Sequence, residues 1–212
     1  MFAQVSKWIA AAALLFSAAV HAEYQAGKEY TVLANPVAVM ADGKVHVEEA
    51  FWYGCPHCFH LEDSIEPWKK TLASDVSFEG VPAMFGKAWV VHAQLYYVAD
   101  VLGVLDQVHE PIFKAIHIHK KRLLDKDEQR EFLMEKAGVS AADFDKAYES
   151  FTVKTRMKQG DQRIRAFQIS GVPALIVQGK YVITASTAGS QDDMLKVADF
   201  LIAKERAALK GK

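Results

Sequence analysis

The pattern of apolar and polar positions predicts strands near both ends of the chain. In the segment KVHVEEAFWY, the apolar residues Val45, Val47 and Phe51 alternate with polar ones, which is the period of a strand with one face in a core. The same kind of reasoning predicts further strands at 76–85, 173–178 and 181–185.

The rest of the pattern has the period of helices, from about residue 88 to residue 160 and again after the last strand. Asp125 and Ser140 are expected to cap two of these helices, Gly138 to end one, and Ser190 to begin the last. The helices are expected at 55–73, 89–103, 106–121, 125–138, 140–151, 158–170 and 190–210.

Strands at both ends with helices between them predict one α/β sheet domain that carries a helical insertion. We expect the sheet domain to be formed by 23–87 and 161–212, and the inserted helical domain by 88–160.

The first 22 residues have the pattern of a secretory signal peptide. Lys7 precedes an apolar run too short to span a bilayer comfortably, and Val20 and Ala22 are small residues placed for signal peptidase. We therefore expect residues 1–22 to be removed, the mature chain to begin near Glu23, and the protein to be exported, although a membrane anchor is the alternative.

The amino-acid composition argues against two classes of binding partner. The chain is 51% hydrophobic and 24% charged, as in ordinary globular proteins, and its formal net charge is −1. A chain with so little net charge offers no bulk electrostatic attraction to nucleic acid or to an anionic membrane, so we expect neither as a partner.

The only two cysteines, Cys55 and Cys58, stand two residues apart in FWYGCPHCFH. A c-type haem site needs histidine directly after the second cysteine, where this chain has Phe59. A structural zinc needs four ligands, and the histidines that could join the two thiols are His57, His60, His92, His117 and His119. Five histidines are instead expected to be surface or packing residues: His60, His92, His109, His117 and His119. A disulfide of so short a loop adds little stability. A redox pair is the interpretation that fits best.

The predicted strand–turn–helix places Cys55 at a helix N-terminus, with Pro56 at an early helical position. There, unpaired backbone amides and the helix dipole favour the thiolate, and His57 adds a donor or a positive charge. Stabilising the thiolate stabilises the reduced protein, which makes the disulfide a stronger oxidant. Cys58, one turn further along, is expected to be more buried and to resolve mixed disulfides at Cys55.

The sequence CPHC after an aromatic-rich strand, the expected signal peptide, the helical insertion and SGVPALIV near the end together resemble the DsbA family of periplasmic thiol:disulfide oxidoreductases. This resemblance covers essentially the whole mature chain. It implies a thioredoxin fold with an inserted all-helical domain, with Cys55 as the attacking cysteine, Cys58 as the resolving one, and Pro56 and His57 as the dipeptide that tunes them.

The resemblance also gives roles to residues outside the CPHC segment. Val172 and Pro173 match a loop whose proline is cis and whose backbone binds an extended substrate peptide. Glu49 falls on the apolar side of its strand, where a carboxylate is costly unless it has a partner, although a shift of register would leave it in solvent. The resemblance makes Glu49 a buried acid that accepts the Cys58 proton, with its pKa raised by burial, and makes Glu62 a second acid.

Two features remain open. The basic side chain expected near position 80 is missing, because Glu79 and Gly80 stand there. The aromatic residues near the cysteines are expected either to form a substrate-binding rim or to belong to the core: Phe51, Trp52, Tyr53 and Phe59.

The function we expect is donation of the Cys55–Cys58 disulfide to unfolded or reduced exported proteins in the periplasm. The resemblance implies reoxidation by a DsbB-like membrane quinone reductase and no bound cofactor or metal. No dimerisation segment precedes Glu49, so we expect a monomer. The alternatives are a disulfide isomerase or reductase that uses the same dithiol, and a non-catalytic metal-binding or chaperone module.

Overall fold

A computed structural model describes residues 24–211 of the 212-residue chain. The expected signal peptide, residues 1–22, lies outside the described residues. Within 24–211, no helix combines the length and the apolar character that a membrane crossing requires.

The centre of the molecule is a mixed five-stranded sheet with the order β1-β5-β4-β2-β3. Strands β2 and β3 are parallel, and the other neighbouring pairs are antiparallel. The strands are β1 (Thr31–Val32), β2 (Val45–Phe51), β3 (Val76–Pro82), β4 (Ala174–Val177) and β5 (Tyr181–Thr184). The four longer strands fall within the predicted segments, whereas β1 was not predicted.

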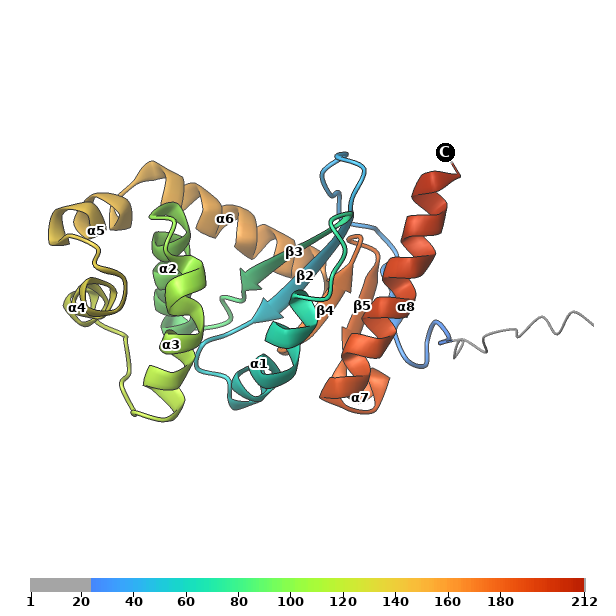
Figure 1. Cartoon of the computed structure of the whole chain (residues 1–212), viewed down its shortest axis with the longest axis horizontal. Coiled ribbons are helices and arrows are strands. Elements are labelled where there is room, and N and C mark those ends of the chain that lie inside the picture. Colours follow the sequence, from blue (N-terminus) through green and yellow to red (C-terminus); the bar gives the residue numbers. More distant parts are fainter. Residues whose placement is uncertain (1–23, 212) are drawn as a thin grey trace, which may run out of the picture.

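The described part of the chain also contains eight helices. They are α1 (Pro56–Lys69), α2 (Lys87–Val101), α3 (Leu105–His117), α4 (Lys126–Ala137), α5 (Ala141–Tyr148), α6 (Phe151–Ala166), α7 (Ala185–Ala188) and α8 (Gln191–Lys210). Helices α2 to α5 form a block beside the sheet, α6 runs back from that block to the sheet, and α1 and α8 lie against one sheet face (Figure 1). A thioredoxin-like sheet with a helical insertion was the predicted architecture, and it is confirmed.

Local capping explains where several helices begin and end. The side chains of Asp125, Ser140 and Ser190 accept hydrogen bonds from backbone amides in the first turns of α4, α5 and α8, as predicted. Gly138 ends α4 in the left-handed conformation, with φ 66°, that glycine adopts without a steric penalty.

Helix α6 begins earlier than the sequence pattern predicted. Ser150 caps it, and it then runs without a break from Phe151 to Ala166. Residue 160, the expected end of the insertion, therefore lies inside a continuous helix that contacts both α2 and β3.

Strand β2 is buried at every position, although its alternation predicted one polar face. Val45 and Val47 pack with residues of α1 and α8, while Ala50 packs on the other face with residues of α6. Glu48 also points to that second face, where Arg163 of α6 binds its carboxylate through two hydrogen bonds of 2.5 and 2.6 Å.

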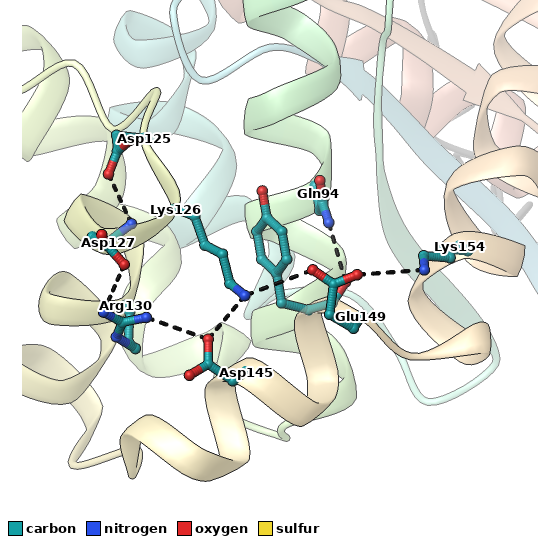
Figure 2. Close-up of polar contacts among 9 residues, drawn as sticks. Gln94, Asp125, Lys126, Asp127, Arg130, Asp145, Glu149 and Lys154 are labelled. Carbon is teal, nitrogen blue, oxygen red and sulfur yellow. Dashed lines mark hydrogen bonds and ion pairs between the residues drawn. The ribbon is translucent and has the colours of Figure 1, made fainter.

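Ion pairs tie the outer helices of the block together (Figure 2). Lys126 at the start of α4 contacts Asp145 of α5 at 3.0 Å and Glu149 at 3.6 Å. Gln94 of α2 donates a hydrogen bond to the Tyr148 carbonyl oxygen. The two ion pairs of Lys126 are largely solvent-exposed, so each contributes little to stability.

Candidate active site

The two cysteines lie where the central strand β2 passes into helix α1. Cys55 is the N-cap of α1 and Pro56 is its first residue, a position at which no amide hydrogen is needed. The Cys55 sulfur accepts a hydrogen bond from the Cys58 amide at 3.4 Å. Both cysteines are free thiols in the structure.

The environment of Cys55 stabilises its thiolate. A hydrogen bond from the Cys58 thiol lowers the pKa of Cys55 to about 6, and the amides of Cys58 and His57 and the charge of His57 act in the same direction, against the opposing effect of burial. This is the direction that the helix N-terminus predicted. At neutral pH Cys55 is therefore mostly a thiolate in the reduced protein.

The environment of Cys58 favours the protonated thiol instead. Its side chain is completely buried, whereas Cys55 is 8% exposed. Burial is the largest cause that raises the pKa of Cys58, followed by its hydrogen bond to Cys55 and the negative charge of Glu49. The pair thus consists of an accessible thiolate and an inaccessible thiol, and Cys58 needs a proton acceptor before it can attack.

The loop before β4 lies beside the accessible sulfur. The Val172–Pro173 peptide bond is cis, as expected from the resemblance. The Cys55 sulfur lies 3.6 Å from the Val172 carbonyl oxygen, to which it donates a hydrogen bond only when it is protonated, so a residue 117 positions away in the sequence borders the reactive atom.

A groove of about 690 Å³ begins at this loop and is lined by His57, by residues 167–173 and by the segment from β5 into α7. His57 is exposed at its edge, and the preceding Pro56 is exposed as well. Gln191, at the start of α8, donates a hydrogen bond of 2.6 Å to the His57 carbonyl oxygen and so connects α8 to the first turn of α1. A second cavity of about 650 Å³ lies between α6 and the sheet, and neither cysteine lines it.

Glu49 is buried beneath α1, only 2% exposed, so the shift of register considered above is excluded. Burial raises the pKa of Glu49 well above its ordinary value, and the negative charge of Glu62 raises it further, while Lys69 acts in the opposite direction. Glu62 is itself 5% exposed. Burial and the nearby negative charge of Glu62 both oppose ionisation of Glu49, which keeps a proton on Glu49 near Cys58.

The four aromatic residues near the cysteines differ in burial, and no contact among the described residues tests whether any of them forms a substrate-binding rim. Phe51 and Tyr53 are each 1% exposed and belong to the core of the helical block. Trp52 is only partly buried and stacks on Trp89, with ring centroids 4.2 Å apart. Phe59 is also partly buried and stacks on His117.

Three of the five histidines expected at surface or packing positions make specific hydrogen bonds. His92 binds the Arg122 carbonyl oxygen through Nε2 at 2.9 Å, and His117 binds the Tyr53 carbonyl oxygen at 2.8 Å. The Tyr53 hydroxyl group hydrogen-bonds to His109 at 2.8 Å. Within 24–211, no group of three His, Cys, Asp or Glu side chains is arranged to hold a metal ion.

Sequence reasoning did not find the contacts of His109, His117 and Gln191. A partial signal was present, because His109 and His117 stand eight positions apart and thus on one face of a helix. Their partner Tyr53 lies more than 50 residues earlier in the chain, and no local pattern identifies it.

A buried thiol, an adjacent thiolate at a helix N-terminus and a cis-proline loop against the same sulfur, all on a thioredoxin-like sheet, define a thiol:disulfide oxidoreductase. A family model described as DSBA-like thioredoxin domain matches residues 60–198. The chain belongs to this DSBA-like thioredoxin family.

Individual relatives agree with this assignment. The thiol:disulfide interchange protein DsbA of Pseudomonas aeruginosa is 44% identical over 202 residues, which cover 95% of each chain. The protein of the same name from Pseudomonas syringae pv. tomato is 43% identical over 97% of this chain and 96% of its own. The crystal structure of Pseudomonas aeruginosa DsbA has a TM-score of 0.83 over 88% of this chain and 97% of its own, at 44% identity.

Proposed function

We propose that this chain is a periplasmic dithiol oxidase that donates the Cys55–Cys58 disulfide to newly exported proteins. The observation that carries this proposal is the opposite environment of the two sulfurs, with the pKa of Cys55 lowered to about 6 and that of Cys58 raised. A stabilised Cys55 thiolate favours the reduced protein, and a disulfide whose reduced form is favoured passes readily to substrate thiols.

The size of the Cys55 pKa shift supports disulfide donation. At pH 7 a thiol pKa of about 6 stabilises the reduced form by about 1.4 kcal/mol, or about 30 mV for a two-electron couple. The same low pKa makes Cys55 a good leaving group when a second substrate thiol attacks the mixed disulfide.

The reaction follows from this asymmetry. A substrate thiolate attacks the Cys55 sulfur and a mixed disulfide forms, while Cys58 leaves and takes a proton from Glu49. A second substrate thiolate attacks the substrate sulfur of the mixed disulfide, the substrate disulfide forms, and Cys55 leaves as a thiolate. The substrate is oxidised by two electrons and the enzyme is reduced.

Other residues have supporting roles in this proposal. His57 stabilises the Cys55 thiolate by its amide and its charge, and Pro56 starts the helix without leaving an amide unpaired. Val172 and Pro173 offer an extended substrate peptide backbone groups next to the Cys55 sulfur. The reduced enzyme then requires reoxidation, for which a DsbB-like membrane quinone reductase has the appropriate chemistry.

The direct test is the equilibrium of the Cys55–Cys58 pair with glutathione, measured on the chain from Glu23. We expect a small excess of reduced glutathione to reduce the disulfide completely. A disulfide that resists reduction as thioredoxin's does would reverse the direction and indicate a reductase.

The substitution Cys55→Ser should abolish oxidative refolding of a reduced test protein, and retained activity would contradict the proposal. A scrambled substrate with several wrong disulfides distinguishes the isomerase alternative, because an oxidase alone rescues it poorly. Release of the chain without residues 1–22 into the periplasmic fraction tests the location.

A further inference from the structure

The buried acid pair, Glu49 and Glu62, has no basic side chain at the place where the resemblance predicted one. Each carboxyl group has one buried oxygen without a hydrogen-bond partner in the described part of the chain. A Cβ atom on Gly80 would lie 3.0 Å from the Tyr96 hydroxyl oxygen and 3.2 Å from the Phe51 ring. Aromatic side chains fill the space that a long basic residue at position 80 would need, so a counter-charge has to come from another element.

His109 reaches the acid pair from helix α3. Its Nε2 lies 3.7 Å from Glu62 Oε1, with the imidazole 15% exposed and the Glu62 side chain 5% exposed. Among residues 24–211, His109 is the one ion-pair partner of Glu62. The contact is long for a hydrogen bond but close for two charges in an environment with little water.

Tyr53 fixes the orientation of this imidazole. Burial raises the pKa of Tyr53 well above its ordinary value, so its phenol keeps its proton. The phenol lies 2.8 Å from Nδ1 of His109 and donates to it when the ring is neutral, which leaves the ring proton on Nε2, facing Glu62. Protonation of His109 then places a full positive charge beside the carboxylate.

Other charged and titratable groups around His109 do not provide this charge. Tyr96 of α2 approaches the ring with its edge, and burial keeps its phenol neutral by raising its pKa. On α3 itself, Glu110 is paired with Lys114 at 2.5 Å, and Asp106 stands one turn earlier. Lys69 of α1 acts on Glu49 from a distance, and its ammonium group contacts Glu66 at 2.5 Å.

We propose that His109 is a positioning residue for thiol exchange, and that its imidazolium is the counter-charge that allows the Glu49–Glu62 pair to release a proton. The proposal rests on the proposed function only in assigning Glu49 as the proton acceptor of Cys58. Because His109 contacts Glu62, it acts on Glu49 through the charge of Glu62.

The step affected is the attack of Cys58 on a mixed disulfide at Cys55. The Cys58 thiol gives its proton to the Glu49 carboxylate, and the thiolate attacks the Cys55 sulfur. The Cys55–Cys58 bond forms, the bond from Cys55 to the other sulfur breaks, and the departing group leaves as a thiolate with its electron pair. Cys58 is oxidised and the departing sulfur is reduced.

The experiment mixes the reduced protein with an excess of the disulfide of thionitrobenzoate, whose thiolate is coloured, and the absorbance at each pH is calibrated with free thionitrobenzoate. Attack by Cys55 releases one coloured thiolate in a phase that depends on reagent concentration. Attack by Cys58 releases the second in a phase that does not. The rate of the second phase is followed from about pH 5 to about pH 8, the range in which an imidazole changes charge.

We expect His109→Gln to raise the pH midpoint of the second phase by about one pH unit, because the negative charge of Glu62 then acts on Glu49 without a neighbouring cation to offset it. Below the midpoint the second phase should slow about tenfold. The first phase, which reports folding and the Cys55 thiolate, should change by less than about twofold. His109→Lys restores a positive charge and should return the midpoint to the wild-type value or below it.

The matched control is His119→Gln, which removes an exposed histidine just beyond the end of the same helix and should leave both phases unchanged. Tyr53→Phe keeps the ring but removes the hydroxyl group that orients His109, so it should shift the midpoint in the same direction by a smaller amount. An unchanged midpoint in His109→Gln would overturn the proposal. If Lys69→Gln shifted the midpoint in that case, Lys69 and not His109 would be the counter-charge. The assay starts from reduced protein, so it stands even if the glutathione equilibrium refutes the donor function.

Discussion

At the scale of single residues, Glu49 combines a predictable position with an unpredictable environment. The alternation of β2 predicted that it faces the side of Val45 and Val47, and it does. That β2 is buried on both faces could not be predicted, because the covering residues come from α6, more than 100 positions later. Similarly, no local pattern indicates that His109 reaches Glu62.

A buried acid with a raised pKa makes stability depend on pH in a defined direction. The folded protein holds the Glu49 proton more tightly than the unfolded chain does, so this group's contribution to stability falls as the pH rises above its ordinary pKa of 4.5. Raising the pKa of a group by one pH unit on folding costs about 1.4 kcal/mol of stability once the pH exceeds both pKa values.

We therefore expect Glu49→Gln in the oxidised protein to be at least about 1 kcal/mol more stable than the wild type at pH 7, with little difference at pH 4. Guanidinium unfolding of both proteins at the two pH values measures this. If the free energy of unfolding changed with pH in the same way in both proteins, burial would not raise the pKa of Glu49. The same variant should slow thiol exchange at Cys58. A variant that is more stable but slower would show that Glu49 lowers stability and accelerates the reaction.

At the scale of elements, helix starts with Asp125, Ser140 or Ser190 were predictable because capping is a local interaction. Helix α6 was placed too late because its first turns, TVKTRMK, lack a strong apolar period, and β1 and α7 are too short to have one. A tertiary contact sets the position of α6, because this helix packs against α2 with Gly160 next to Tyr97.

Gly160 permits this close approach of the two helices. A Cβ atom at this position would lie 2.1 Å from the Tyr97 hydroxyl oxygen. Alanine in place of glycine normally stabilises a helix by about 1 kcal/mol, whereas overpacking costs about 1–3 kcal/mol.

We expect Gly160→Ala to be destabilising, and the double variant Gly160→Ala with Tyr97→Phe to recover much of the loss because the clashing oxygen is removed. Thermal unfolding of the four proteins of this cycle measures the coupling. Additive effects of the two substitutions would show that the helices do not depend on this contact.

At the scale of the whole molecule, the active site is assembled from every part of the fold. Strand β2 and helix α1 supply the cysteines, the loop before β4 supplies Val172, α8 holds His57 through Gln191, and α3 holds Tyr53. The CPHC sequence predicted the first of these contributions. The others depend on chain crossings that bring residues more than 50 positions apart into contact.

Because the active site is part of the core, its redox state changes the stability of the whole protein. In the reduced form Cys55 has a pKa of about 6, depressed from 9.0, so its stabilising contribution is complete above pH 9.0 and is lost as the pH falls through about 6. At pH 7 it amounts to about 1.4 kcal/mol. The oxidised form has no thiolate to stabilise, and its disulfide closes too short a loop to restrict the unfolded chain much.

We therefore expect the reduced protein to be more stable than the oxidised protein at pH 7, which is the reverse of the usual effect of a disulfide. The advantage should shrink when both forms are unfolded in guanidinium at pH 5, because the Cys55 thiolate is then largely protonated in the folded state as well. A more stable oxidised form at pH 7 would mean that the helix N-terminus does not favour the thiolate enough to drive disulfide donation, and the direction of the proposed reaction would have to be reversed.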